Sequence, residues 1–500
     1  MNKNEMNASN KSLPSGASWL NIACVGVVQA SMGAVVVTTT TTLNRVMVVE
    51  LALPAMLPGF LVSLHYFIQM IRPRMGHGAD QTARCTPWIL GGMAVLTLGG
   101  ILAALATTWM ANAFILGVLS AVLAFCMIGI GVSACGTTLL VLLSKGVGDQ
   151  QRPGAATAVW CMMIFGFALT SIVSGKLLDP FSFERLLEVS IGVSCLAMFL
   201  SALSLWGLES RLLNTQAKAT MSEKLSLPSH VVTSSPNVSS NQGESQGSST
   251  HQFKDALSQL WKDEQARLFT FFVFTSMLAY SAQDLVLEPF AGFIYHFTPG
   301  QTTQLSGALH ASVLAGMLLL ALIGSRRING RLGSISTWMI AGCLVSAIGM
   351  LGLCYAGWLG AYERHLPLNP ILLVLGLGNG LFSIAAISTM MRLATQQKQT
   401  LEIQGESVRP GIRMGLWGAA QAIAFGLGGV VGTAASDFSK MWFANASWAY
   451  AIVFALEAFM FVLSAWIAWR VKNLGGENNR EPFESPEAHK ASRHLSLNAT

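Results

Sequence analysis

The chain has 500 residues, of which 52% are hydrophobic and only 11% are charged, and its mean hydropathy is +0.52. Soluble proteins carry about a quarter charged residues, so this composition excludes a soluble enzyme, a disordered scaffold and a disulfide-rich secreted module. It indicates an integral membrane protein. The net charge of +6, spread over the whole chain, provides no basic patch for nucleic acid.

A membrane-spanning helix needs roughly 20 mostly apolar residues. We therefore predict an all-α membrane protein with six helices in an N-terminal half (19–208) and six in a C-terminal half (266–470). The polar ends, 1–18 and 471–500, are expected to be cytoplasmic tails, the second of them disordered. The twelve predicted spans are 19–40, 54–71, 88–108, 113–143, 154–176, 187–208, 267–288, 304–324, 335–357, 370–391, 414–434 and 446–469.

A polar segment, 209–265, separates the halves. Its middle, 222–250, is rich in Ser, Asn, Gln and Gly and is expected to be a flexible linker, because it has too little apolar surface to offset the entropy of ordering. Its end is different, because apolar side chains recur there with helical spacing. This pattern predicts a short amphipathic helix on the membrane surface, with Phe253, Leu257, Leu260 and Trp261 on one face.

The distribution of positive charge predicts the orientation. With the N-terminus in the cytoplasm, all but five of the 30 lysines and arginines fall on the cytoplasmic side, and lysine and arginine favour that side. Both termini are therefore expected in the cytoplasm. The five exceptions are Arg45, Lys176, Arg185, Arg364 and Lys440.

Parts of the two halves resemble each other. Arg-Pro-Gly is followed by a tryptophan eight residues after the arginine in both, at Arg152 and at Arg409, and each stretch then reaches an Asp followed by Phe-Ser, at Asp179 and Asp437. The repeat and the linker together predict two parallel six-helix halves, as in major facilitator transporters.

The loop after the second span reads RPRMGHGADQTARCTPW. Gly76, Asp80 and Arg84 fit part of the G-x-x-x-D-x-x-x-R pattern of the major facilitator loop between helices 2 and 3, in which an acid and a base join neighbouring helix ends. The alternative is a loop made basic by the topology rule alone.

Four ionisable residues follow the first span and end the seventh: Arg45, Glu50, Asp284 and Glu288. Such groups cost several kcal/mol in a membrane unless they are paired or in contact with water. We therefore predict an interhelical charge cluster in which Arg45 pairs with Asp284 or Glu288 across the halves. The alternative is four ordinary helix-end charges in the headgroup layer.

The strings that contain these charges, NRVMVVELALPA (44–55) and QDLVLEPFAG (283–292), the latter leading into TPGQTTQLSG, resemble the bacteriochlorophyll-delivery family. This family is the PucC and LhaA branch of the major facilitator superfamily, and the similarity runs from about Trp19 to Arg470. The resemblance implies a protein that handles chlorophyll-type pigment during photosynthetic assembly, with antenna polypeptides or chlorophyll synthase as partners, in the inner or intracytoplasmic membrane of a phototrophic bacterium.

The magnesium of a chlorophyll takes one axial ligand, often a neutral histidine nitrogen. His65 and His310 are the histidines best placed within apolar segments, and small residues around His310 would let a flat ring approach. We predict them as pigment ligands, in line with the resemblance. The alternative for each is a hydrogen bond to a neighbouring helix. Pigment would be the bound cargo, and no metal or nucleotide cofactor is expected.

Glycines, cysteines and one acid within the spans have simple structural interpretations. The glycine-rich run 376–380 lies within a span and predicts close helix contact, as do Gly428 and Gly432. The eight cysteines lack a CxxC pair and are interpreted as buried hydrophobes. Glu457, near the middle of the last span, is expected to face the interior, with a proton relay as a possible role.

Neither a nucleophile with an adjacent base nor a nucleotide-binding loop is visible in the sequence, and we expect no enzymatic activity. The predicted function is binding and delivery of (bacterio)chlorophyll or a late precursor. One alternative is a proton-coupled transporter of an amphipathic solute that uses Asp284, Glu288 or Glu457. The other is an assembly scaffold that binds no pigment.

Overall fold

The computed structural model describes residues 17–72, 75, 84–148, 151–214, 264–323, 334–403, 410–443 and 445–474. All the regular structure within these ranges is helical. The N-terminal half contains one continuous helical rod, Trp19–Glu50, made of α2 (Trp19–Val37), η1 (Thr38–Thr42), α3 (Leu43–Arg45) and η2 (Val46–Glu50). It continues with α4 (Met56–Ile68), η3 (Gln69–Ile71), α6 (Thr86–Met110), α7 (Phe114–Gly146), α8 (Arg152–Leu177) and α9 (Phe183–Leu205). The C-terminal half comprises α12 (Glu264–Tyr295), α13 (Pro299–Ile323), α14 (Ile335–Gly360), α15 (Leu368–Ile403), α16 (Pro410–Trp442) and α17 (Ala446–Leu474).

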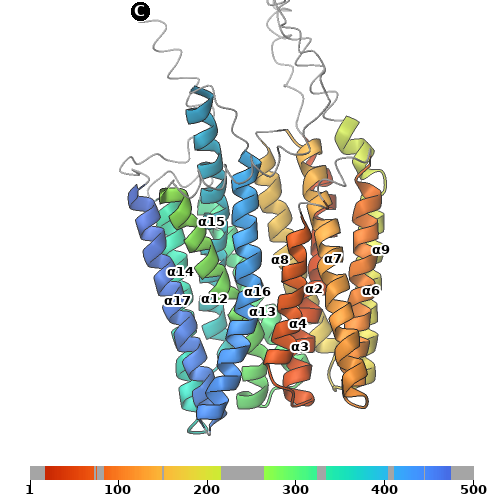
Figure 1. Cartoon of the computed structure of the whole chain (residues 1–500), viewed down its shortest axis with the longest axis vertical. Helices are drawn as coiled ribbons and strands as arrows, with labels where there is room; N and C mark the ends of the chain where they lie inside the picture. Colours follow the sequence, from red (N-terminus) through yellow and green to blue (C-terminus); the bar gives the residue numbers. More distant parts are fainter. Residues whose placement is uncertain are drawn as a thin grey trace, which may run out of the picture.

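Eleven of these helices are long and apolar enough to cross a membrane, which confirms the prediction of a multi-pass helical membrane protein. The second predicted span is occupied by a shorter apolar helix, Met56–Ile71. Figure 1 shows the helices standing side by side in one bundle. The predicted flexible linker (222–250) and the predicted amphipathic helix (253–261) lie outside the described residues.

Several helices continue beyond their predicted ends, and two of them do so through residues that disfavour a helix. The first was expected to end at residue 40 but reaches Glu50, because five threonine hydroxyls and the side chains that follow them find partners inside the bundle. Helix α12 was expected to end at residue 288, before a proline, but continues to Tyr295. Glu288 and Phe290, on either side of Pro289, are 0% exposed, so packing maintains the helix where the proline removes a backbone donor.

The buried apolar residues form two clusters, one for each half. Only Ile164 and Leu285 belong to the cluster of the opposite half. Across the interface, α4 packs against α16 and α8 packs against α13 (Figure 1). The halves therefore meet through two repeat-related helix pairs.

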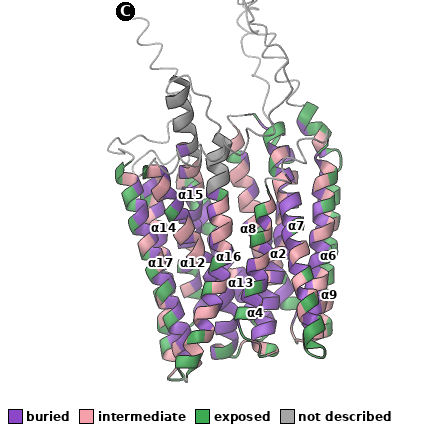
Figure 2. Ribbon diagram, in the orientation of Figure 1, coloured by how far each residue is buried: buried purple, intermediate pink, exposed green. Residues whose placement is uncertain are grey.

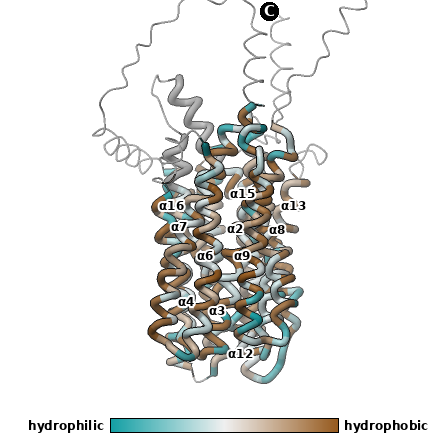
Figure 3. Tube along the Cα trace, turned by 90° about the vertical axis from the view of Figure 1, so that its right-hand side faces the viewer, coloured by the Kyte–Doolittle hydropathy of each residue, from teal (hydrophilic) through white to brown (hydrophobic). Residues whose placement is uncertain are grey.

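Large apolar side chains also cover the outside of the bundle. Leu119 is 64% exposed and Phe459 is 63% exposed, although both side chains are fully apolar. Figure 2 shows exposed residues along the outer helices, and Figure 3 shows hydrophobic residues over most of the length of the bundle with hydrophilic ones near its ends. This surface suits lipid. We call the end at which α9 ends and α12 begins the linker end, and the opposite end, which contains Arg45, the Arg45 end.

Candidate functional site between the two halves

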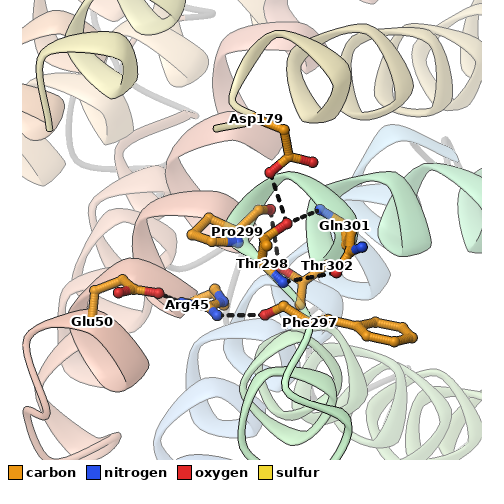
Figure 4. Close-up of polar contacts among 8 residues, drawn as sticks. All are labelled: Arg45, Glu50, Asp179, Phe297, Thr298, Pro299, Gln301 and Thr302. Atoms are coloured by element: carbon orange, nitrogen blue, oxygen red, sulfur yellow. Dashed lines mark hydrogen bonds and ion pairs between the residues drawn. The ribbon is translucent and has the colours of Figure 1, made fainter. Parts of the chain in front are cut away.

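Arg45 is buried at the Arg45 end, with 2% of the residue exposed. Its Nη1 forms an ion pair with Glu50 Oε1 at 2.5 Å, and its Nη2 donates a hydrogen bond to the carbonyl oxygen of Phe297 at 2.7 Å (Figure 4). The ion pair of Arg45 is therefore with Glu50 and not, as predicted, with Asp284 or Glu288, although Arg45 is an electrostatic neighbour of Glu288. Because Glu50 lies five residues further along the same helical rod, it reaches the guanidinium without crossing the interface. Arg45 still joins the halves, through the backbone of Phe297.

The sequence around Arg45 explains how this polar segment remains helical inside the bundle. Residues 38–42 are all threonine and form a π-helical stretch, in which the hydroxyls of the first four donate to carbonyls three or four residues earlier. Thr42 and Thr303 share a hydrogen bond of 3.2 Å across the halves, and the Asn44 amide donates to the carbonyl of Leu285 at 2.8 Å. Segments of π-helix occur frequently at functional sites.

The two acids of α12 lie one turn apart in different surroundings. Glu288 is 0% exposed and accepts a hydrogen bond from the Ser306 hydroxyl at 2.6 Å, whereas its second oxygen has no partner among the described residues. Asp284 is half-buried, with Tyr66, Tyr280 and Glu457 as electrostatic neighbours. Arg45 and Glu288 are buried, unlike ordinary charges of the headgroup layer, whereas the Glu50 side chain is 33% exposed.

Aromatic rings from both halves surround this region. Tyr66 of α4 lies 5.1 Å from Phe425 of α16, and Phe425 lies 6.0 Å from Tyr280 of α12, measured between ring centroids. The Ser63 hydroxyl also donates to the carbonyl of Gly426, which joins α4 to α16. Asp284 therefore belongs to a mixed acidic and aromatic region at the α4–α12–α16 contact.

The two predicted pigment ligands share one arrangement. His65 Nδ1 lies 2.6 Å from the carbonyl oxygen of Val62, and His310 Nδ1 lies 2.8 Å from that of Ser306. A carbonyl only accepts, so each Nδ1 carries the proton, and in the neutral ring Nε2 then has a free lone pair. Both carbonyls belong to the histidine's own helix. The Nδ1–H groups therefore do not bond to a neighbouring helix, which was the alternative.

The two rings differ in their surroundings. His65 is 0% exposed, its Nε2 has no partner among the described residues, and it packs against Tyr66 and Phe125 inside the N-terminal half. His310 contacts Phe167 of the opposite half edge to face, with 5.2 Å between centroids. Of the two histidines, His310 therefore lies at the interface between the halves.

The glycine predictions are confirmed as packing. A Cβ on Gly376, Gly378 or Gly380 would lie within 2.5 Å of α13 or α14 atoms, and one on Gly428 or Gly432 would press into α12. Glu457 is 3% exposed, which confirms that it faces the interior, and neither of its carboxyl oxygens has a hydrogen-bond partner among the described residues. The cysteines are only partly as predicted, since Cys195 is exposed while Cys85, Cys135 and Cys343 are buried.

The predicted loop motif is described only at its end. Gly76 and Asp80 lie outside the described residues, and Arg84 is an electrostatic neighbour of Glu209. Glu209, which the sequence analysis missed, accepts hydrogen bonds from the backbone N–H groups of Cys85 and Thr86 at 2.7 and 3.0 Å. It thereby caps the start of α6.

Two further residues at the interface were visible in the sequence only as part of the repeat. Asp179 accepts a 2.7 Å hydrogen bond from the hydroxyl of Thr298, just before α13 (Figure 4). Asp437 accepts from the backbone N–H groups of Ala55 and Met56, at the start of α4. The repeated aspartate therefore binds the start of a helix in the opposite half each time.

The side-chain amide of Asn379 donates a buried hydrogen bond to Gln283, and nothing in the sequence indicated this contact.

The chemistry that the two histidines offer to a metal is that of a single nitrogen ligand. Within the described ranges, no group of three or more His, Cys, Asp or Glu side chains is arranged to hold an ion. A magnesium that is already held by a tetrapyrrole needs only one more donor, and the unprotonated Nε2 of His65 or His310 would be a donor of that kind.

Comparison with solved structures shows the fold. A bacterial homologue of the human drug peptide transporters aligns with a TM-score of 0.62 at 13% identity, over 93% of this chain and 100% of that one. The nucleoside transporter NupG aligns with a TM-score of 0.58 at 16% identity, over 90% and 99%. Both are major facilitator transporters, so the two-half, all-helical architecture predicted from the sequence is confirmed.

Sequence comparison shows the family. The bacteriochlorophyll synthase 44.5 kDa chain of Rhodobacter capsulatus is 42% identical over 453 residues, which cover 90% of this chain and 95% of that one. Protein PucC of Cereibacter sphaeroides is 27% identical over 453 residues, with coverage of 87% and 88%. The model of the PUCC protein family matches residues 42–475. The chain therefore belongs to the PUCC protein family, as the strings around Arg45 and Glu288 predicted.

Proposed function

We propose that this protein binds (bacterio)chlorophyll, or a late precursor, inside the membrane and delivers it during assembly of light-harvesting complexes. The names of its relatives support pigment as the cargo. The structural observation that carries the proposal is the state of His65 and His310, whose Nδ1–H groups are held by backbone carbonyls. Each ring therefore offers Nε2, the form of histidine that ligates metals.

His310 is the better candidate for the axial ligand. It lies on α13 against Phe167 of α8, so a change in the contact between the halves would open a space beside its ring. His65 is fully buried, and α7 lies so close to α4 that a Cβ on Gly129 would be 2.8 Å from the His65 carbonyl oxygen. A pigment ring that reaches His310 would gain most of its affinity from burial of apolar surface, with the single nitrogen setting its orientation.

The proposal extends to location and partners. We place the protein in the inner or intracytoplasmic membrane with both termini in the cytoplasm, on the basis of the lysine and arginine distribution. Chlorophyll synthase or antenna polypeptides are the proposed recipients or sources of pigment. We propose that this chain performs no chemistry itself, because a lipid-soluble cargo needs only a site that binds it and shields it from aggregation.

The experiment is an absorption spectrum of the protein purified gently from its pigmented host. We expect bound chlorophyll-type pigment in near-stoichiometric amount, several-fold less in His310→Phe, and a smaller loss in His65→Phe. His365→Phe is the matched control, because His365 is exposed in a loop beside Tyr295. A colourless protein that still holds chlorophyll synthase or antenna polypeptides would contradict the proposal and favour a scaffold. A colourless and solitary protein would favour a transporter that uses Asp284, Glu288 or Glu457.

A further inference from the structure

A narrow crevice opens on the outside of the C-terminal half, between α16 and α17, with α12 as its floor. Its cavity volume is about 20 Å³. Val431 and Leu456 stand at its mouth, where they are 45% and 47% exposed. Because the outer surface of these helices is apolar, this mouth opens toward lipid rather than water.

The floor of the crevice is formed by small residues. A Cβ on Gly428 would lie 2.6 Å from the carbonyl oxygen of Leu278, and one on Gly432 would lie 2.7 Å from the Cβ of Ala282. These glycines bring α16 close to α12 and leave a depression in front of them. The close contact between α12 and α16 therefore fixes the floor of the crevice.

One polar side chain faces this apolar crevice. Glu457 lines it, is 3% exposed, and has no hydrogen-bond partner at either carboxyl oxygen among the described residues. The other lining residues are glycine, alanine, valine, leucine and methionine. The ionisable neighbour of Glu457 is Asp284, which is also an acid. An isolated carboxylate in such surroundings costs several kcal/mol, so the neutral acid is favoured there.

A neutral carboxylic acid has one O–H group to donate, and the crevice itself offers no acceptor to Glu457. A ligand that enters from the bilayer would satisfy this donor if it carried a carbonyl or ester oxygen on an apolar body. At this volume the crevice admits one group of about the size of a water molecule, such as a carbonyl oxygen. Only the carbonyl oxygen would therefore enter the crevice, while the body that carries it lies on the surface of α16 and α17.

From these observations we infer a second, lipid-facing pigment site, in which the Glu457 carboxyl donates a hydrogen bond to a carbonyl at the edge of a tetrapyrrole ring that docks between α16 and α17. The inference rests on the proposed function, since it takes the ligand class from it. The site is separate from both histidines, because His65 lies on α4 and His310 on α13. A pigment held there would already be inside the bilayer, in the position of an incoming or outgoing cargo.

The test is a titration of the full chain in lipid nanodiscs with bacteriochlorophyll a, in the wild type and in a His65→Phe, His310→Phe background. Glu457→Leu removes the donor, and Val431→Phe fills the mouth without changing Glu457. Both are expected to weaken binding in the background variant roughly tenfold, the effect of losing a buried hydrogen bond. Glu457→Gln, which retains a donor, should restore most of it.

Leu427→Phe is the matched control, because Leu427 is 37% exposed on α16, one turn from Val431, and does not line the crevice. The infrared band of the pigment's ring-edge carbonyl should shift on binding to the wild type and remain unshifted in Glu457→Leu. Equal binding by the background variant with and without Val431→Phe or Glu457→Leu would overturn this site and leave the proposed function in place. A wild type that binds no pigment would overturn both.

Discussion

The two ends of the bundle are held together by different kinds of contact. At the Arg45 end, polar contacts cross between the halves: Arg45 binds Phe297, Asp179 binds Thr298, and Asp437 binds the start of α4. At the linker end, the described contacts stay within one half. They join Glu209 to α6, Gln151 to Ala17, and Lys472 to Thr337.

This difference indicates which contacts depend on the relative position of the halves. A rigid-body movement of one half against the other would break the contacts at the Arg45 end and preserve those at the linker end. The structure thus represents a conformation in which the halves are joined at the Arg45 end. The contacts that cross the interface should therefore control the conformational equilibrium, whereas the others should control only the stability of one half.

The repeat adds a second comparison, between Asp179 and Asp437. Both acids bind the start of a helix in the opposite half, but Asp179 accepts from a hydroxyl while Asp437 accepts from two backbone N–H groups. A carboxylate beside unpaired N–H groups at a helix start also gains from the helix dipole. Asp437 should therefore contribute more than Asp179.

The largest effect is expected for Arg45→Ala. This variant removes a buried guanidinium, leaves the carbonyl of Phe297 without its donor, and separates Glu50 from its partner. We expect a loss of about 2 to 3 kcal/mol in the free energy of unfolding, below the range for a fully buried pair because Glu50 is 33% exposed. Unfolding by denaturing detergent measures it.

Arg185→Ala is the control for Arg45→Ala. Arg185 lies at the same end but donates to the carbonyls of Asp179 and Pro180, within its own half. Its loss should cost at most about 1 kcal/mol, the contribution of a partly exposed hydrogen bond. Equal losses in the two variants would contradict the view that contacts across the interface dominate at this end.

The next effect concerns the repeated aspartates. Asp437→Ala should destabilise the protein by about 1 to 2 kcal/mol and Asp179→Ala by less, since the first loses two backbone partners and the second one hydroxyl. Hydrogen exchange measured by mass spectrometry should show faster exchange at Ala55 and Met56 in Asp437→Ala only. Faster exchange there in Asp179→Ala as well would show that the two contacts open together.

Much of this architecture could be predicted because the membrane imposes strong rules on composition. Hydropathy located the spans, and the repeat and the linker together indicated two halves. The ends of the first and seventh helices were missed for a shared reason. Threonines 38–42 and Pro289 disfavour a helix locally, but burial against the other half overrides that preference.

Partners of side chains were harder to predict. Arg45, Asp284 and Glu288 were correctly recognised as unusual, yet the partner of Arg45 was wrong, because the sequence cannot show that η2 returns Glu50 to the guanidinium. The histidines were identified by residue type and apolar context. The sequence could not show that the Nδ1–H of each histidine donates to a backbone carbonyl, because this bond depends on side-chain geometry.

The smallest effect is expected at the linker end. Glu209→Ala removes the cap of α6 and should cost about 1 kcal/mol, which corresponds to exchange several-fold faster at Cys85 and Thr86. Exchange at Ala55 and Met56 should not change, because the partners of Glu209 among the described residues all lie in its own half. Ser334→Ala is the matched control, since Ser334 accepts from the backbone N–H of Thr337 at the start of α14, in the other half. If exchange at Ala55 and Met56 were also faster in Glu209→Ala, the two ends would be coupled, and the linker end would take part in joining the halves.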